Sequence, residues 1–210
     1  MQLYGYFRSS ASYRVRIALA LKGLSVTQVS KHLRLGEQLA DDFRKLNPQA
    51  MVPVLVTDNG ENLTQSLAII EWLEETHPQP RLLPADPLQR ARIRAFALSI
   101  ACEIHPLQNL RVLKNLGSHG LDESARNQWA HDVNAQGLTN CETMLQGATT
   151  PFCFGNAPSL ADICLVPQMF NARRFGVDTR KFVRLHAIEA QCLALDAFQS
   201  SAPERQADAE

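Results

Sequence analysis

The sequence predicts an α/β domain followed by an all-helical domain, and three features support this division. Up to about residue 80, short strand-like runs alternate with helix-like runs. After about residue 90, apolar residues recur every three or four positions, as on one face of a helix. Between these parts, residues 77–90 contain four prolines, which fit neither a regular helix nor a central strand. We therefore expect domain boundaries at 1–80 and 89–210, with a linker at 81–88.

The elements expected in the first domain follow the order βαβαββα. A helix between the first two strands allows them to pair in parallel, whereas Asn59-Gly60 favours an antiparallel hairpin with a type I′ turn, since both residues tolerate a positive φ. This arrangement is thioredoxin-like, and Pro53, at the start of the third strand, is the expected cis-proline. The expected segments are a strand at 2–7, a helix at 10–22 ended by Gly23, a strand at 25–33, a helix at 37–47, a hairpin at 53–64, and a helix that Ser66 caps and that ends before Pro78.

The second domain is expected to be a helical bundle, with a kink or an interruption at Pro106 and another at Pro167. The spacing of Ser159 and Asp162 is that of a capping box, so we interpret this pair as a helix start and not as a catalytic pair. Residues 204–210 are small and polar, and we expect a frayed tail there. The expected helices lie at 88–116, 122–145, 159–175 and 185–198.

The charge balance and the cysteines restrict the kinds of partner. Lys plus Arg and Asp plus Glu each number 21, so no net field attracts nucleic acid or an anionic membrane, and anion recognition must come from local arginines. The sequence has no leader-like N-terminus and no apolar run long enough to span a membrane, which indicates a cytoplasmic protein. The five cysteines lack CxxC spacing and the six histidines lack ligand spacing, so we expect no metal and a reducing compartment.

The turn at Ser9-Ser10 joins a strand to a helix, where unpaired N–H groups favour an anion. One of these serines can also simply cap the helix. If the anion is a thiolate, lowering a thiol pKa by two units takes about 2.7 kcal/mol, which is more than the helix end supplies. A serine hydroxyl donating a hydrogen bond would make up the difference. The first half of the chain contains no cysteine, so such a thiol must arrive with a ligand.

A second candidate anion site lies at Gln65-Ser66, directly before another helix. The serine can be another N-cap, but an amide and free N–H groups also suit a small carboxylate. Together, the two helix starts describe a site for a small thiol peptide.

Five segments of the chain, spanning Leu3 to about Phe198, resemble zeta-class glutathione transferases, the family of maleylacetoacetate and maleylpyruvate isomerases. The resemblance implies a glutathione transferase fold, glutathione as cofactor and a homodimer. In this family the third residue of the first-turn motif is usually cysteine, and here it is Ala11, a departure that bears on substrate processing. The segments read "SSASYRVRIALALKG", "NPQAMVPVL", "QSLAIIEWLEE", "IHPLQNLRVLKNLG" and "SLADICLVPQMFNARRFGVD".

The resemblance also implies roles for single residues. Ser9 would orient and ionise the glutathione thiol, with Ser10 beside it, and Val52, before Pro53, would pair its backbone with the cysteinyl unit. Further positions that would hold glutathione or line its entrance are Gln65 and Ser66 at the γ-glutamyl carboxylate, and His105, Gln108 and Asn109.

Arginines are the candidates for binding an acidic substrate, because a guanidinium can pair with a carboxylate through two hydrogen bonds. The resemblance favours Arg8, Arg111 and Arg174 as substrate residues, with Arg8 and Arg174 assisting catalysis. Arg173 is interpreted as a solvated surface residue. Arg14 and Arg16 are interpreted as structural or interfacial.

The function implied is glutathione-dependent cis–trans isomerisation of maleylpyruvate or maleylacetoacetate, by thiolate addition, rotation about the former double bond and elimination. His105 and Arg111 favour maleylpyruvate slightly. One alternative is a glutathione transferase that conjugates or dehalogenates small electrophiles such as haloacids. Another is a non-catalytic binding protein with the same fold, although such a protein would be expected to lose Ser9, Gln65 and Ser66.

Overall fold

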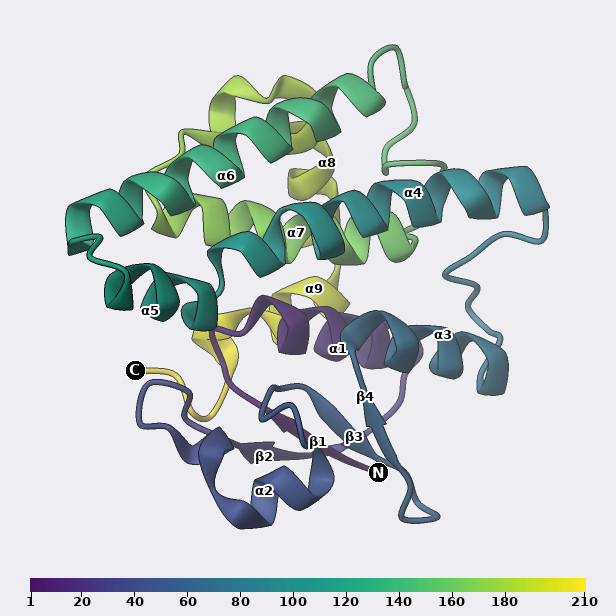
Figure 1. Cartoon of the computed structure of the whole chain (residues 1–210). Coiled ribbons are helices and arrows are strands. Elements are labelled where there is room, and N and C mark those ends of the chain that lie inside the picture. The colour runs from purple at the N-terminus through teal and green to yellow at the C-terminus, as the bar shows by residue number, and fades with distance from the viewer. The chain divides into compact units, whose positions relative to one another are not determined.

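The computed structural model describes all 210 residues, which form two compact units (Figure 1). Unit 1 comprises residues 1–81 together with 194–210, and unit 2 comprises residues 82–193. The C-terminal residues, which the sequence assigned to the helical domain, thus cluster with the α/β part of the chain.

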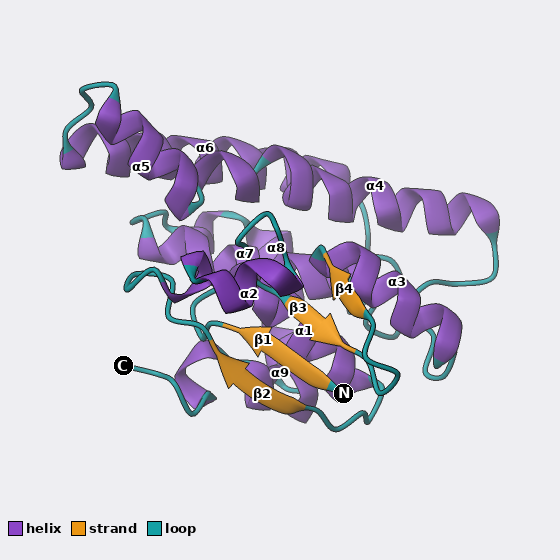
Figure 2. Ribbon diagram, turned by 60° about the horizontal axis from the view of Figure 1, so that its bottom comes forward, coloured by secondary structure: helices purple, strands orange, loops and turns teal.

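Unit 1 is built on a four-stranded sheet in the strand order β2-β1-β3-β4. Strand β1 runs parallel to β2 and antiparallel to β3, and β3 runs antiparallel to β4, which confirms the thioredoxin-like arrangement. Helices α1 and α3 cover one face of the sheet and α2 covers the other (Figures 1 and 2). The elements are β1 (Gln2–Gly5), α1 (Ser10–Leu21), β2 (Thr27–Ser30), α2 (Asp41–Leu46), β3 (Val54–Val56), β4 (Asn62–Thr64) and α3 (Ser66–Thr76), with a 3₁₀ turn at Glu37–Leu39.

The turn between β3 and β4 is longer than the expected type I′ turn. Gly60 has a φ of 82°, but Asn59 does not adopt a positive φ, so a two-residue turn is wrong. Thr57 closes the loop instead: its N–H donates to the carbonyl of Glu61, and its hydroxyl accepts from the N–H of Glu61. The loop is closed by this side-chain hydrogen bond, so it does not need the positive φ that the sequence pattern predicted for Asn59.

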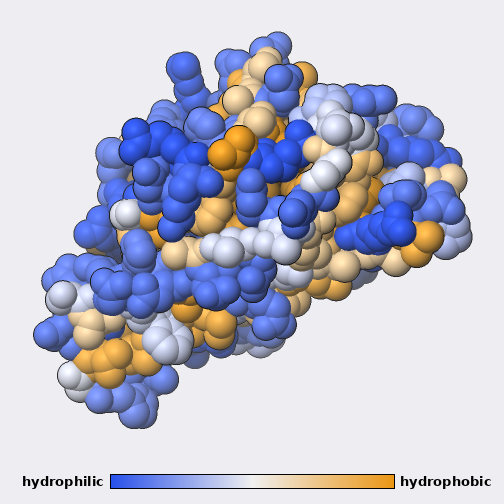
Figure 3. All heavy atoms as spheres, turned by 90° about the horizontal axis from the view of Figure 1, so that it is seen from above, coloured by the Kyte–Doolittle hydropathy of each residue, from blue (hydrophilic) through white to orange (hydrophobic).

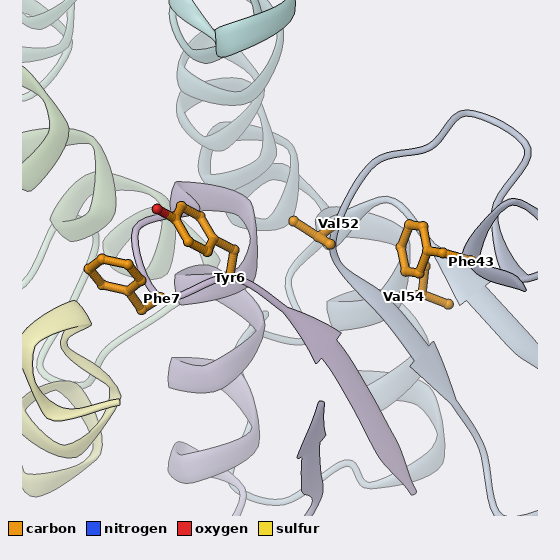
Figure 4. Close-up of a cluster of buried hydrophobic side chains, with 5 residues drawn as sticks. All are labelled: Tyr6, Phe7, Phe43, Val52 and Val54. Carbon is orange, nitrogen blue, oxygen red and sulfur yellow. The ribbon is translucent and has the colours of Figure 1, made fainter. Parts of the chain in front are cut away.

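Aromatic and β-branched side chains form a buried cluster at the end of β1 (Figure 4). Tyr6 and Phe7 follow β1, Phe43 comes from α2, and Val52 and Val54 flank the start of β3. Burial of such side chains contributes roughly 1.5–3 kcal/mol each. The cluster therefore fixes the backbone directly before the Ser9-Ser10 turn.

The C-terminal segment packs on α1 through helix α9 (Asp196–Ser201), and a 3₁₀ turn at Pro203–Arg205 follows this helix. Phe198 is fully buried, and its carbonyl accepts a hydrogen bond from the Tyr13 hydroxyl. Arg16, also buried, donates to the carbonyls of Ser201 and Phe7, each at 3.0 Å. These contacts join the end of the chain to its beginning.

Unit 2 is a helical bundle around α7, most of whose residues are buried. The expected helix at 88–116 is interrupted at Pro106, as predicted, whereas α7 continues through Pro167. At Gly137, a Cβ atom would lie 2.4 Å from the Ile104 side chain, so only glycine permits this close packing. The elements are α4 (Pro87–Glu103), a 3₁₀ turn at His105–Gln108, α5 (Leu110–Ser118), α6 (Glu123–Met144), α7 (Leu160–Arg174), a 3₁₀ turn at Thr179–Lys181 and α8 (Val183–Leu193).

No helix is both long enough and apolar enough to cross a membrane. No group of three or more histidine, cysteine or acidic side chains is arranged to hold a metal ion.

Candidate functional site

The N-terminus of α1 has a serine cap and no acidic residue in its first turn. Ser9 is the N-cap, and its Oγ accepts a hydrogen bond from the N–H of Ser12 at 3.2 Å. Accepting this bond uses one lone pair, so the hydroxyl hydrogen of Ser9 remains able to donate. Ser9 is half-buried and Ser10 is buried. The capping role and the anion-binding role are therefore compatible at Ser9.

The N-terminus of α3 differs from the expectation. The N-cap is Gln65, and Ser66 is the first helical residue, so the prediction of Ser66 as N-cap is wrong. Gln65 has a φ of 66° and no side chain caps this helix. A positive φ at a residue other than glycine is a strained conformation that clusters at functional sites. The first N–H groups of α3 therefore lack a capping side chain of their own.

A buried arginine links these two helix starts. Arg14, on α1, is 2% exposed, and its Nη1 lies 3.4 Å from the Oγ of Ser66. A carboxylate bound at the start of α3 would thus meet a positive charge held in a low-dielectric environment, where an ion pair is stronger than in water. Sequence reasoning interpreted Arg14 only as structural or interfacial.

The segment before β3 supplies a further part of the site in unit 1. The peptide bond between Val52 and Pro53 is cis, as expected, and both residues are buried. Gln65 donates from its Nε2 to Gln49 at 2.9 Å, so the loop before β3 is tied to the start of α3.

Two residues in unit 1 were not selected from the sequence but have the character of ligand-binding groups. Arg14 is one of them. The other is Gln38, which is mostly buried and whose Oε1 has no hydrogen-bond partner. The position of Arg14 among the buried residues of α1 could have indicated a functional arginine from the sequence. The residues around Gln38 give no comparable indication.

Arg8 follows the Tyr6-Phe7 pair and lies over the Phe7 ring, with its guanidinium carbon 4.8 Å from the ring centre. Its Nη2 is 3.4 Å from a carboxylate oxygen of Glu210, near the C-terminus. The prediction that residues 204–210 form a frayed tail is therefore wrong, because long-range contacts of Glu210 and Asp208 hold these residues on unit 1.

In unit 2, several candidate residues gather where the 3₁₀ turn meets α5. Asn109 caps α5 by accepting from the N–H of Val112 at 3.1 Å. Gln108 is 3% exposed, and its Nε2 has no hydrogen-bond partner. His105 lies in the same turn, and Arg111 is exposed one turn further on. A buried amide without a partner, beside an exposed guanidinium, is a group that a polar ligand can satisfy.

The two arginines at the end of α7 have different surroundings. Arg173 forms two hydrogen bonds with Glu189, at 2.7 and 2.8 Å, so it is part of an ion pair within unit 2 and not simply a solvated residue. Arg174 is exposed, with its Nη1 3.2 Å from Asn171 and its guanidinium carbon 5.9 Å from the Phe175 ring centre. Arg173 is thus paired with a carboxylate of the chain, whereas Arg174 contacts an amide and an aromatic ring.

Ser159 and Asp162 form the expected capping box at the start of α7. Asp162 accepts from the N–H and the hydroxyl of Ser159, each at 2.9 Å, and from the N–H of Cys153 at 2.8 Å. Burial raises the pKa of the Asp162 carboxyl, against the effect of these hydrogen bonds. All of its contacts are structural.

Three of the five cysteines are buried thiols that remain protonated near neutral pH. Burial raises the pKa of Cys141 to about 12, and it raises the pKa values of Cys153 and Cys192 as well. None of the five cysteines lies in the stretch around Ser9. A thiol that acts at the start of α1 must therefore belong to a ligand.

Comparisons with known proteins place the whole chain among related proteins. Residues 3–81 match the family model described as "Glutathione S-transferase, N-terminal domain". The chain is 48% identical over 208 residues to a protein of Mus musculus named maleylacetoacetate isomerase, covering 98% of this chain and 94% of that protein.

Two solved structures are similar over their whole lengths, each covering 100% of both chains. A holo structure of maleyl pyruvate isomerase, described as a bacterial glutathione S-transferase of the zeta class, has a TM-score of 0.96 at 44% identity. A maleylacetoacetate isomerase of Methylobacterium extorquens AM1, crystallised with malonate and glutathione, has a TM-score of 0.96 at 40% identity.

Proposed function

This chain belongs to the zeta class of glutathione transferases, the family of the maleylacetoacetate and maleylpyruvate isomerases, and from that premise we propose that it is a glutathione-dependent cis–trans isomerase. Its substrate would be maleylacetoacetate or maleylpyruvate, each a small diacid with a cis double bond conjugated to a ketone. The observation that carries the proposal is the pair of helix starts in unit 1, which lack acidic residues and are joined by buried Arg14.

The residues present fit glutathione. The γ-glutamyl carboxylate suits the uncapped N–H groups of α3, the Ser66 hydroxyl and the charge of Arg14. The backbone at Val52, beside the cis peptide bond, is proposed to pair with the cysteinyl unit, with Pro53 shaping the turn. Gln38, Gln65, His105, Gln108 and Asn109 would supply further polar contacts. The orphaned Oε1 of Gln38 and Nε2 of Gln108 fit a ligand N–H and a ligand oxygen, respectively.

When bound, glutathione would supply a sulfur that can both add to the double bond and leave again. Ser9 is proposed to hold that sulfur as a thiolate by donating its hydroxyl hydrogen, with the α1 N-terminus and neighbouring Ser10 adding favourable dipoles. A hydrogen bond to a charged group contributes about 1.5–3 kcal/mol, and a helix end about 0.3–1 kcal/mol. Their sum reaches the roughly 2.7 kcal/mol needed to lower a thiol pKa by two units.

The arginines are proposed to bind the diacid and to stabilise negative charge on its ketone oxygen during reaction. The residues proposed for this role are Arg8, Arg111 and Arg174. Charge that develops only in the transition state is what such preorganised donors stabilise best. The relative crystallised with malonate and glutathione supports a dicarboxylate as the second ligand.

The test is the decay of maleylpyruvate and maleylacetoacetate absorbance with the purified protein, with and without glutathione. Glutathione-dependent formation of the fumaryl product is expected, and the ratio of the two rates identifies the preferred substrate. Glutathione binding without turnover of either substrate would contradict the isomerase and favour a transferase that conjugates electrophiles or dehalogenates haloacids.

We also propose a homodimer in the cytoplasm. Large apolar side chains are exposed on α4, α6 and the turn between α4 and α5, and apolar patches interrupt the polar surface in Figure 3. These exposed apolar side chains are candidates for burial against a second copy of the chain. Between α4 and α6 lies a groove of about 470 Å³ with a mixed lining that includes Leu107 and Val133 as well as Glu103 and Asp132. Light scattering coupled to size exclusion gives the mass in solution, and the mass of a single chain would contradict the dimer.

The cytoplasmic location is proposed on the basis of the cysteines. Five free cysteines are consistent with a reducing compartment, which cell fractionation would test.

A further inference from the structure

Residues 206–210 form what we call the C-terminal tail, which is anchored at its first residue and at its middle. At its start, the Nε2 of Gln206 donates to the carbonyls of Ser200 and Ala202, each at 2.9 Å. Further on, one carboxylate oxygen of Asp208 accepts from the backbone N–H of Phe7 at 3.1 Å and from the Ser30 hydroxyl at 2.7 Å. The tail therefore crosses the edge of unit 1 beside the residues that precede Ser9.

At the end of the tail, Glu210 meets a cluster of basic side chains. One of its carboxylate oxygens lies 3.4 Å from the Nη2 of Arg8, and the other contacts the Nε2 of His32. The hydrogen bond from His32, followed by the charges of His32, Arg8 and Arg34, holds the pKa of the Glu210 carboxyl below its ordinary value. The position where an external carboxylate would approach Arg8 is thus next to a carboxylate of the chain itself.

We propose that the C-terminal tail is an internal competitor for the acidic substrate, with Asp208 as its anchor and Glu210 as the group that pairs with Arg8. The inference rests on the proposed function, in which Arg8 binds a carboxylate of the diacid. Glu210 contacts the Nη2 of Arg8, and a substrate carboxylate paired with that nitrogen would compete with Glu210 for its donors and be repelled by its charge. The two anchors leave Glu210 free to move away without detaching the whole tail.

The exposure of this ion pair suits a contact that opens and closes. The side chains of Arg8 and Glu210 are 28% and 45% exposed, and ion pairs at such positions are weak and easily exchanged. The tether nevertheless keeps Glu210 at a high effective concentration near Arg8. Competition of this kind raises the apparent KM for the diacid and disappears at saturating substrate, so kcat and glutathione affinity do not change.

The first experiment compares the wild type with Glu210→Gln and Asp208→Asn in steady-state assays with the diacid at saturating glutathione. If the tail is docked in most molecules, each variant lowers the KM for the diacid by about three- to tenfold, because the competent fraction rises. Ser30→Ala removes the hydroxyl that donates to Asp208, so it also lowers the KM for the diacid. In the double variant with Asp208→Asn, it lowers the KM little further, because both changes remove the same hydrogen bond. The matched control is Glu204→Gln, an exposed carboxyl in the preceding 3₁₀ turn, which leaves the KM unchanged.

The second experiment does not depend on turnover and separates this inference from the proposed function. Calorimetry with malonate and bound glutathione measures carboxylate affinity directly, and Glu210→Gln binds malonate more tightly than the wild type by the same factor. In the wild type, malonate also narrows the amide NMR signal of Glu210 as the tail is released. Tighter malonate binding by Glu210→Gln, in a protein without isomerase activity, would support competition by the tail and contradict the proposed isomerase function.

Three results overturn the inference. An unchanged KM and an unchanged malonate affinity in Glu210→Gln would show that the tail does not compete. A raised KM together with a lowered kcat would make the tail part of the binding site. An absence of malonate binding in every variant would show that no carboxylate site exists at Arg8 for the tail to occupy.

Discussion

The starts of α1 and α7 are both capped by a serine but have opposite electrostatic surroundings. At α7, the chain supplies its own carboxylate: Asp162, buried, accepts hydrogen bonds from both the N–H and the hydroxyl of Ser159. At α1, the first turn contains no acidic residue, and Arg8, Arg14 and Arg16 lie before it or within the helix. The nearest carboxylates, Asp208 and Glu210, come from the far end of the chain and contact Phe7 and Arg8, not the first N–H groups of the helix.

The difference shows how one sequence feature acquires two roles. A helix start favours an anion, and where the chain provides that anion the helix start is structural. Where the helix's own first turn contains no acidic residue and arginines lie nearby, a ligand can provide the anion instead. The serine alone therefore predicts neither role, and the surrounding charges separate them.

The largest effect is expected from removing the structural carboxylate. Asp162→Ala leaves buried N–H groups of Ser159 and Cys153 without an acceptor, and it should lower the free energy of unfolding by about 2–4 kcal/mol. Urea denaturation followed by circular dichroism measures this change. Asp86→Ala is the control, since Asp86 caps α4 at an exposed site through the N–H of Gln89, and it should lower the free energy by only about 1 kcal/mol. If the two variants lose the same free energy of unfolding, the burial of the Asp162 carboxylate does not increase its contribution to stability.

A second variant pair tests the two serines directly. Ser9→Ala should raise the pKa of the bound glutathione thiol by about one to two units, because it removes a hydrogen bond to the thiolate. Ser159→Ala should leave that pKa unchanged and lower stability by about 1 kcal/mol. The thiolate ultraviolet band, followed against pH, measures the pKa. If the pH dependence of the thiolate band is unchanged in Ser9→Ala, Ser9 only caps its helix, as Ser159 does.

A third comparison concerns buried and paired arginines. Arg14→Met should weaken glutathione binding by about tenfold or more, since it removes the buried charge beside Ser66, and it should leave the affinity for the diacid nearly unchanged. Arg173→Met is the matched control, because Arg173 is already paired with Glu189, so glutathione binding should not change. Calorimetry with glutathione distinguishes the two. Loss of diacid affinity alone in Arg14→Met would reassign this arginine to the substrate.

The features predicted from sequence are those that neighbouring residues determine. The βαβαββα order, the cis peptide bond at Pro53, the interruption at Pro106 and the capping box at Ser159 each follow from residues a few positions apart. The type I′ turn at Asn59 was wrong, because the Thr57 side chain closes a longer loop.

The features that escaped prediction depend on contacts between distant parts of the chain. Arg14 meets Ser66 across 52 positions, and Phe7 meets Asp208 across 201 positions. The polar composition of residues 204–210 predicted a frayed end, since nothing nearby reveals that Ser30 and Phe7 provide donors for it. The strained φ of Gln65 likewise requires the fold around it.

The smallest expected effect is the pH dependence of tail docking. In the tail the chain supplies an exposed carboxylate, Glu210, to Arg8, which precedes α1. Because the hydrogen bond from His32 lowers the pKa of the Glu210 carboxyl, docking stabilises the tail when this carboxyl is ionised, and the stabilisation is lost as the pH falls through the lowered value. The amide NMR signal of Glu210 should therefore narrow on acidification in the wild type, whereas in Glu210→Gln it should already be narrow and stay so. Asp162, whose pKa burial raises, is shifted in the opposite direction, so its anion is favoured by hydrogen bonds but disfavoured by its environment. A wild-type signal that does not respond to acidification would mean that the tail is held by Asp208 and Gln206 alone, and that Glu210 does not contribute to its docking.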